Sequence, residues 1–460
     1  MASAKRFPDR DEIAAVRAEA ERLEPGATDD SAERRLAGRV MARRDLGKLV
    51  FLDLVDRSGR IQLICPVERT GELDLHLGDV VGVTGSPARS RRGEASLQVD
   101  GLEVLAQNRT PLPDTFHGLT DIELRYRKRH LDLLMNDEVR REAQIRSLMV
   151  RTIRRILDDW GFIEVETPIL QPRYGGAFAE PFKTFWHELG EERYLRIATE
   201  LYLKRLIVGG LEKVYEIGKD FRNEGVSFKH HPEFTMLEWY EAYADYRDTM
   251  ERIETLVAET AQEVIGTTKV TFRGSEIEFE PPWKRVTFTD ALAEHGLWTR
   301  NEHELREGLK QRGVDVSRDP TWAKLIDHAH SHFVEPTLIQ PTILYDYPIE
   351  LSPFARQTDH DPALVERFEY FAGGMELGNA FTEINDSEDQ QSRFATLVAQ
   401  RAAGDAEAEE PDWDYVEALS YGMAPTGGLG LGIDRLAMLL TGRESIRDAI
   451  LFPALRTKTS

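Results

Sequence analysis

Hydrophobic and polar residues alternate over the N-terminal quarter of the chain, with the period of two that is typical of half-buried β-strands. Asp56–Gly59 separates two of these runs and has the polar residues and the glycine of a hairpin turn. About five short strands favour a barrel of the OB-fold type over residues 34–108, with a generic small β-domain as the alternative. The clearest runs are Leu49–Leu54, Ile61–Ile64, Val80–Gly85 and Ala95–Val99.

A period close to 3.6 residues predicts helices on both sides of this β-region. Residues 1–33 read as an N-terminal extension, with a short amphipathic helix over Asp11–Leu23. Two prolines lie in residues 109–120, which we interpret as a linker. A second domain, residues 121–460, follows.

The second domain begins with a helix, a strand and a proline. Val139–Trp160 has helical periodicity, and Gly161–Pro168 changes to a strand that ends at the proline. Residues 249–341 are predicted to form a largely helical insertion. The chain has no internal repeat, and its one biased stretch is the acidic run Ala403–Asp414.

The composition is that of a globular protein with more than one domain. With 460 residues, 41% of them hydrophobic, the chain is long enough for two or three cores. Cys65 is the single cysteine, which excludes an internal disulfide and a cysteine-based zinc site and fits a cytoplasmic setting. We find no signal peptide and no apolar run of membrane-spanning length, so we expect no membrane association.

The net charge of −22, from 81 acidic and 59 basic residues, would by itself argue against a nucleic-acid partner. The charges are unevenly distributed, however. Arg34–Arg92 contains many cations, whereas the acidic run contains none. A basic face on an acidic body remains compatible with nucleic-acid binding.

Three short segments of the second domain concentrate groups that bind phosphates and a base. They are Phe221–Glu224, His230–Thr235 and Gly430–Arg435. Arginine offers a planar fork that matches a phosphate or a carboxylate. A phenylalanine can stack on a base, and a glutamate can accept from an exocyclic amine. Together these groups could hold a bent triphosphate and an adenine without a P-loop.

These segments resemble motifs 2 and 3 of the class II aminoacyl-tRNA synthetases, and Leu36 to Arg456 is similar to the bacterial lysyl-tRNA synthetases. The resemblance implies an α+β fold, in which an OB-fold anticodon-binding domain precedes an antiparallel sheet flanked by helices. It also implies that ATP and L-lysine form lysyl-adenylate, from which lysine passes to the 3′ end of tRNA(Lys). Arg151–Pro168 resembles motif 1, which implies a homodimer.

The resemblance also assigns the ATP-binding residues. Arg222 would hold the α-phosphate and the lysine carboxylate, and Glu224 would bind the adenine amino group. His230 and Arg435 would clamp the distal phosphates, and Phe234 would stack on the base. Because negative charge develops when a carboxylate attacks the α-phosphorus, Arg222 and Arg435 would lower the barrier as catalytic residues.

Glu369 and Glu376, which flank Gly373 and Gly374, are candidate ligands for Mg²⁺. Magnesium prefers one or two carboxylates together with substrate phosphates. Taken alone, the pattern fits two solvated glutamates beside a turn equally well. The family match implies the metal role and a contact between Glu369 and ATP.

Glu238 and Glu383 are expected to face one pocket together with Tyr240. Buried carboxylates require a cation, which the ε-ammonium of lysine would supply, whereas a pocket for aspartate would require an arginine. By resemblance, the carboxylate of Glu200 and the carbonyl of Gly176 would bind the α-amino group. The lysine-binding set is completed by Arg222 and Asn379.

Four barrel residues are candidates for binding the anticodon, namely Arg44, Phe51, Gln62 and Glu94. Phe51 and Gln62 fall on adjacent strands, where a ring could stack on a base and an amide could pair with a base edge. Arg44 and Glu94 match family positions. The alternative is that Phe51 belongs to the barrel core.

Two other motifs carry no function in this interpretation. His328, His330 and His332 resemble a metal cluster, but on a helix His330 would point about 200° away from its neighbours. Gly428–Gly432 resembles a phosphate-binding loop but lacks Gly-Lys-Ser/Thr, and its glycines would let adenosine approach the backbone.

Glu180 and His231 depart from the family, which usually has Arg or Lys and Asn at these positions. Two rival functions remain: a ligase that passes activated lysine to a protein or lipid, and a non-catalytic RNA-binding protein on a synthetase scaffold. The barrel argues against the first, and the full set of activation residues argues against the second.

Overall fold

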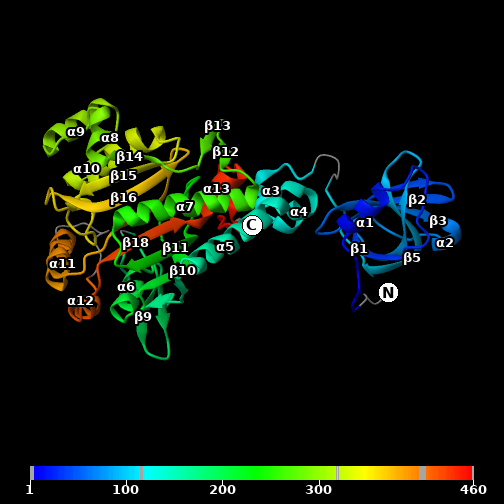
Figure 1. Ribbon diagram of the computed structural model, residues 1–460, viewed down its shortest axis with the longest axis horizontal. Helices are drawn as coiled ribbons and strands as arrows, with labels where there is room; N and C mark the ends of the chain where they lie inside the picture. Colours follow the sequence, from blue (N-terminus) through cyan, green and yellow to red (C-terminus); the bar gives the residue numbers. More distant parts are fainter. Residues whose placement is uncertain are drawn as a thin grey trace. The chain divides into compact units, whose positions relative to one another are not determined.

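The computed structural model describes residues 5–113, 118–177, 179–317, 319, 321–402 and 411–457. Most of the acidic run that begins at Ala403 lies outside the described residues. The chain divides into two compact units, residues 1–136 and residues 137–460 (Figure 1). Among the described helices, none combines the length and the apolar character that crossing a bilayer requires.

The first unit is built on a closed barrel with the strand order β1-β2-β3-β5-β4, which confirms the five strands predicted from the sequence. Inward-facing Val, Leu and Ile side chains fill its core. The turn predicted at Asp56–Gly59 joins two antiparallel neighbours. The strands are β1 (Arg34–Leu46), β2 (Leu49–Val55), β3 (Arg60–Pro66), β4 (Val80–Arg89) and β5 (Ala95–Ala106).

The N-terminal helix is present but is not separate from the barrel, because Ile13 and Val16 belong to the barrel core. The predicted linker has no helix or strand in its described residues, 109–113 and 118–120. The compact unit continues to residue 136, beyond the boundary predicted at residue 121. Its helices are α1 (Ile13–Glu21), α2 (Val67–Thr70), α3 (Ile122–Arg127) and α4 (Arg129–Met135).

The second unit contains an eight-stranded sheet in the order β14-β15-β16-β17-β18-β11-β10-β6. Its six central strands are antiparallel, as predicted, but each edge ends in a parallel pair, β14 with β15 and β6 with β10. The strands are β6 (Ile163–Glu164), β10 (Lys213–Phe221), β11 (Glu233–Ala242), β14 (Lys284–Thr287), β15 (Thr342–Pro348), β16 (Leu364–Ala372), β17 (Met375–Thr382) and β18 (Thr426–Gly432).

Helices pack against both faces of this sheet. On one face α5, α7 and α13 bury a core with the sheet, and α5 confirms the helix predicted over Val139–Trp160. A second core lies against α6, α8, α9, α10 and α12. The helices are α5 (Asp137–Asp159), α6 (Glu200–Val208), α7 (Tyr246–Ile265), α8 (Phe288–Glu294), α9 (Glu302–Gln311), α10 (Trp322–Ala329), α11 (Ser387–Ala402), α12 (Trp413–Ser420), α13 (Ile433–Thr441) and α14 (Ile446–Ala449).

The segment 249–341, predicted to be largely helical, also contains strands. β12 (Lys269–Phe272) and β13 (Ser275–Glu278) form a hairpin, and β14 joins the edge of the main sheet. These strands are only four residues long, too short for a clear period of two. A π-helical turn, His330–Val334, continues α10, and 3-10 turns cover Glu335–Thr337 and Ile349–Leu351.

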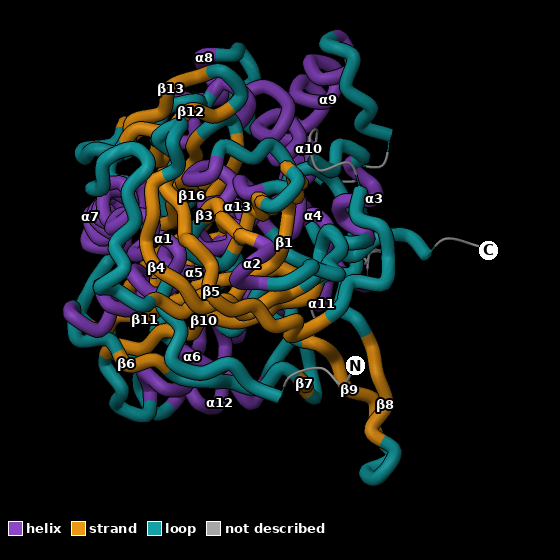
Figure 2. Tube along the Cα trace, turned by 90° about the vertical axis from the view of Figure 1, so that its right-hand side faces the viewer, coloured by secondary structure: helices purple, strands orange, loops and turns teal. Residues whose placement is uncertain are grey.

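A separate three-stranded sheet lies near the start of the second unit. Its order is β7 (Leu170–Gln171), β9 (Glu191–Leu195) and β8 (Lys183–Trp186). Figure 2 shows, as Figure 1 does, that the hairpin of β8 and β9 extends away from the body of this unit.

Candidate active site

A cavity of about 330 Å³ opens on one face of the main sheet. The alternation along β11 builds its floor, because Leu237 and Trp239 enter the core while Glu238 and Tyr240 face the cavity. All the site residues predicted for the catalytic domain line this cavity. They are Gly176, Glu200, Arg222, Glu224, His230, Phe234, Glu238, Tyr240, Glu369, Glu376, Asn379, Glu383 and Arg435.

Gly428 of β18 makes room for two of these side chains. A Cβ atom at this position would lie 1.9 Å from Oε1 of Glu383 and 2.6 Å from Cε1 of Tyr240. Since both neighbours are buried, neither could move aside easily. The glycines that the sequence suggested as space for adenosine therefore include one that admits the protein's own glutamate.

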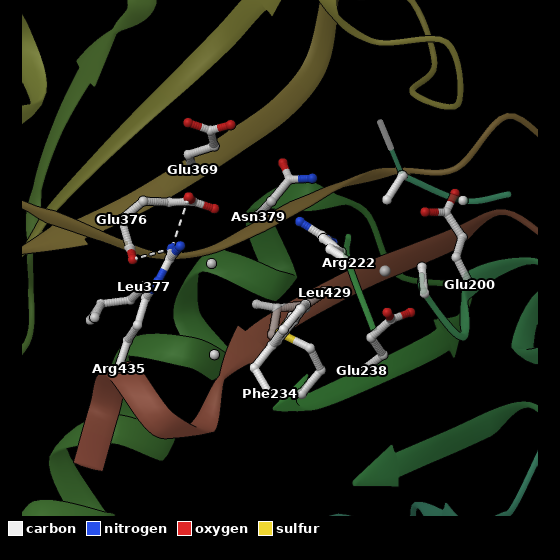
Figure 3. Close-up of a pocket in the computed structure, with 18 of the residues that line it drawn as sticks. Glu200, Arg222, Phe234, Glu238, Glu369, Glu376, Leu377, Asn379, Leu429 and Arg435 are labelled. Atoms are coloured by element: carbon white, nitrogen blue, oxygen red, sulfur yellow. Dashed lines mark hydrogen bonds and ion pairs between the residues drawn. The ribbon is translucent and has the colours of Figure 1, made fainter. Parts of the chain in front are cut away.

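One end of the cavity holds three buried glutamates, Glu200, Glu238 and Glu383, the first two of which are labelled in Figure 3. Burial raises the pKa of each carboxyl group. Glu200 and Glu383 form ion pairs with the ammonium of Lys204. This end of the cavity therefore contains more buried carboxylates than buried cations.

Glu238 is held by neutral groups. Its carboxylate accepts from the Tyr240 hydroxyl and from the Thr199 N–H, each over 3.2 Å. Burial, and then the nearby carboxylates of Asp220 and Glu200, raise the pKa of Glu238 to about 8. A ligand cation placed here would ionise it.

Arg222 lies between the two ends of the cavity in Figure 3. It directly follows β10, and its guanidinium carbon lies 5.1 Å from the centre of the Phe234 ring. The Nε donor of Arg222 is buried and has no hydrogen-bond partner among the described residues. Because an unpaired buried donor is costly, this atom is well suited to an oxygen of a ligand.

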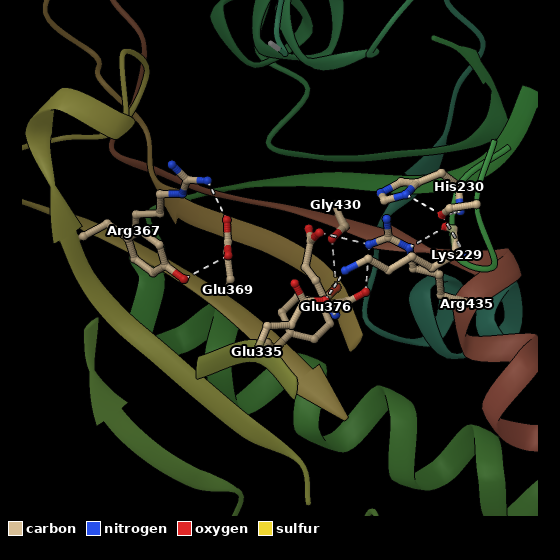
Figure 4. A network of polar contacts seen from close by, with 11 residues as sticks. Lys229, His230, Glu335, Arg367, Glu369, Glu376, Gly430 and Arg435 are labelled. Atoms are coloured by element: carbon tan, nitrogen blue, oxygen red, sulfur yellow. Dashed lines mark hydrogen bonds and ion pairs between the residues drawn. The ribbon is translucent and has the colours of Figure 1, made fainter. Parts of the chain in front are cut away.

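The other end of the cavity is organised by Arg435 and Glu376 (Figure 4). Nη1 of Arg435 donates to Oε2 of Glu376 over 2.9 Å, and its Nε donates to the Lys229 carbonyl over 3.3 Å. Burial alone would raise the pKa of Glu376, but Arg435 lowers it to about 2. Desolvation of the ring within the cavity, and then the cations of Arg435 and Lys229, lower the pKa of His230 to about 4. His230 is therefore neutral at pH 7.

Glu369 lies on β16, next to the strand of Glu376. Its carboxylate accepts from Nη2 of Arg367 over 2.7 Å and from the Tyr347 hydroxyl over 2.9 Å. Burial raises the pKa of Glu369 to about 7; Arg367 opposes this rise and Glu376 adds to it. Two partly exposed carboxylates that repel each other and line a cavity fit one divalent cation shared with a phosphate ligand.

The three histidines at positions 328, 330 and 332 have different surroundings. His330 is buried and packs against the rings of Phe288 and Phe371 at 5.4 Å, while His328 and His332 meet edge to face at 5.6 Å. In the part of the chain that the structure describes, no three His, Cys, Asp or Glu side chains form a metal-binding group.

Both parts of the chain match known protein families. Residues 121–456 match the model of the class II tRNA synthetases (D, K and N), and residues 35–105 match that of the OB-fold nucleic acid binding domain. The chain belongs to the class II tRNA synthetases. Curated relatives named lysine–tRNA ligase are 50% identical in Roseiflexus castenholzii and 47% identical in Pelotomaculum thermopropionicum. These matches cover 92% of this chain and 89% and 86% of the relatives.

The barrel of this synthetase presents the predicted anticodon residues in two pairs. Phe51 is half-buried and lies outside the barrel core, which rules out the core alternative. The guanidinium carbon of Arg44, opposite it on β1, lies 5.9 Å from the ring centre. The Gln62 amide donates to Glu94 over 3.0 Å.

The two departures from the synthetase pattern have different surroundings. Glu180 is exposed, and its carbonyl accepts from the Asn223 N–H over 2.8 Å. His231 is buried: Nε2 accepts from the Ala454 N–H over 2.7 Å, so Nδ1 carries the proton for the carbonyl of Glu233. His231 therefore ties the end of the chain to the start of β11.

Two functional contacts were missed from the sequence. Lys204 follows Glu200 by one helical turn, and this i,i+4 spacing was the signal. Arg146 of α5 donates to Asp434 over 2.5 Å and to Thr235 over 3.1 Å, and no sequence signal indicated it. Since Asp434, in the first turn of α13, also accepts from the Thr235 N–H of β11, Arg146 links α5 to both of these elements.

Proposed function

We propose that the protein is a lysine–tRNA ligase. The observation that carries the proposal is the cavity with three buried glutamates at one end and Arg222, Lys229 and Arg435 toward the other. A diamino acid matches the acidic end, and a triphosphate matches the basic end. The curated relatives named lysine–tRNA ligase support the same assignment.

In the first step, an oxygen of the lysine carboxylate attacks the α-phosphorus of ATP, and pyrophosphate leaves with the electrons of the broken P–O bond. Arg222 would neutralise the charge that develops on the α-phosphate, and Phe234 beside it would stack on the adenine. Neutral His230, with Arg435, would hold the outer phosphates. The product would be lysyl-adenylate.

In the second step, a terminal ribose hydroxyl of tRNA(Lys) attacks the lysyl carbonyl, and AMP leaves. During the first step, Glu369 and Glu376 would hold Mg²⁺, which neutralises charge on the phosphates of ATP. The barrel would bind the anticodon through Arg44, Phe51, Gln62 and Glu94. Because charged tRNA is consumed by translation, the enzyme would act in the cytoplasm.

Lysine-dependent ATP–pyrophosphate exchange, run beside charging of tRNA(Lys), tests the function. A lysine–tRNA ligase performs both reactions. Exchange without charging would instead indicate another acceptor for lysine, and the absence of exchange would indicate a non-catalytic protein.

We also propose that two copies form a homodimer through α5 and β6. β6 is the outer strand of the main sheet, and Ile163 on it is 48% exposed. The nearby Ile169 and Leu170 are similarly exposed, which leaves apolar surface for a second copy to cover. Sedimentation at micromolar concentration should give the mass of a dimer; the mass of a monomer would exclude this interface.

A further inference from the structure

Lys204 is the buried cation nearest to the acidic end of the cavity. It lies on α6, one turn after Glu200, and its side chain is 0% exposed. Its ammonium forms ion pairs with Glu200 and with Glu383, which follows β17 in the chain. One lysine therefore joins two of the three carboxylates that the substrate would meet.

Lys204 lies behind these carboxylates and not in the substrate space. Glu200 and Glu383 line the cavity, but Lys204 is not among the described residues that do. Its position on the buried face of α6 holds it there. Lys204 is thus a fixed part of the wall and not a side chain that occupies the site in place of substrate.

Four aromatic rings surround the ammonium, with their centres 5.1–5.9 Å from Nζ. Such ring faces stabilise a buried cation. Burial alone would lower the pKa of Lys204, but the carboxylates of Glu200 and Glu383 raise it above its ordinary value. Lys204 is therefore charged at any working pH. The rings belong to Tyr240, Phe354, Phe381 and Tyr415.

The charges at this end of the cavity can be counted. Glu200, Glu238 and Glu383 contribute three negative charges when ionised, and Lys204 contributes one positive charge. Neighbouring charged groups have partners of their own: Arg205 pairs with Asp412, Asp220 with Arg196, and Arg367 with Glu369. Two negative charges remain without a cation, and lysine brings two ammonium groups.

We propose that Lys204 is a positioning residue that sets this count: it holds Glu200 and Glu383 ionised and directed at the cavity, so that the site accepts an amino acid with two ammonium groups. The inference rests on the proposed function and deepens it. Burial raises the pKa of both carboxyl groups, and Lys204 opposes the rise. Without Lys204 the carboxyl groups would take up protons and lose their attraction for the substrate.

The test is lysine-dependent pyrophosphate exchange by the full-length Lys204→Met variant. We expect the KM for lysine to rise by roughly 100-fold, while the KM for ATP stays within about threefold of the wild-type value. Lys213→Met is the control. It also removes a lysine that pairs with a buried glutamate, Glu241, but neither residue lines the cavity. The control should leave both KM values unchanged.

A double-mutant cycle separates positioning from general stability. If Lys204 acts through Glu383, then adding Lys204→Met to Glu383→Gln should raise the KM for lysine by less than about a further tenfold. A purely structural role would instead make the free-energy costs of the two changes additive. An unchanged KM for lysine, an equal rise in the KM for ATP, or additivity would overturn the proposal.

If Lys204→Met does not fold, Lys204→Arg decides, because it keeps the charge. A KM for lysine within about tenfold of the wild-type value supports the role of the charge. A KM for lysine raised by roughly 100-fold in folded Lys204→Arg would overturn it. A wild-type protein without lysine-dependent exchange would refute the proposed function itself, which none of the variant results can do.

Discussion

The cavity of the second unit and the outer face of the barrel use the same residue types in different surroundings. In both, an arginine lies over a phenylalanine: Arg222 at 5.1 Å from Phe234, and Arg44 at 5.9 Å from Phe51. In the cavity Arg222 and Phe234 are half-buried and the carboxylates of Glu200 and Glu238 are buried, whereas on the barrel Phe51 is half-buried but Arg44 and Glu94 are exposed.

This difference in burial sets the size of the effects to expect. Removing one partner of a buried ion pair costs several kcal/mol, because the other charge is left buried without a partner. An exposed ion pair contributes about 1 kcal/mol or less. The cavity can therefore select a small ligand by charge, residue by residue. The barrel has to recognise a flexible nucleic acid through stacking and several weak contacts.

The strongest test of this comparison is Arg222→Ala. Because Arg222 would face the charge that develops at the α-phosphorus, kcat for pyrophosphate exchange should fall by about 1,000-fold. Arg44→Ala is the matched control, since it removes the same side chain from the other arginine–phenylalanine pair. It should leave exchange unchanged, and comparable losses in the two variants would contradict the comparison.

Glu383→Gln tests selection by charge. The change keeps the shape of the side chain but leaves the substrate ammonium under-paired. The fall in kcat/KM for lysine should correspond to a loss of about 2–5 kcal/mol in transition-state stabilisation. The KM for ATP should not change. Glu94→Gln on the barrel, where the carboxylate is exposed, is the control and should not affect exchange. Unchanged kinetics for lysine would remove Glu383 from the pocket.

The pH dependence of lysine binding should report Glu238, whose pKa is raised to about 8. Below pH 8 the Glu238 carboxyl group of the free protein is protonated, and this proton must leave before Glu238 can pair with a substrate ammonium. The KM for lysine should therefore fall by up to about tenfold per unit as the pH rises toward 8, and then level off. Glu238→Gln should abolish this dependence, and a KM that rises with pH would contradict it.

The sequence was sufficient where structure is local. The alternation within each barrel strand predicted the barrel. The phosphate- and lysine-binding residues could be assigned by resemblance because each lies in a short continuous motif. The cavity brings all of them together.

The sequence was insufficient where a contact joins distant segments. Lys204 and Glu383 are 179 positions apart, and no pattern near either residue indicates that they form an ion pair. Arg146 meets Asp434 across most of the chain. The edge strand β14 is parallel to a strand that begins more than fifty residues later, and no local pattern specifies that pairing.

The smallest expected effect, and the one that most sharpens the comparison, belongs to Phe51→Ala. If Phe51 stacks on an anticodon base, the variant should lose about 1–3 kcal/mol of discrimination between tRNA(Lys) and an anticodon-swapped tRNA. Lysyl-adenylate formation should not change, because the cavity lies in the other compact unit.

Leu52→Ala on the same strand provides the contrast. Leu52 is 0% exposed within the barrel core, so its truncation should cost about 2–5 kcal/mol of folding stability, whereas Phe51→Ala should melt nearly as the wild type does. Thermal melts beside charging of the two tRNAs separate these outcomes. A folded Phe51→Ala variant that discriminates as well as the wild type would show that the barrel recognises tRNA without this ring, and the matched arginine–phenylalanine geometry would then have a function only in the cavity.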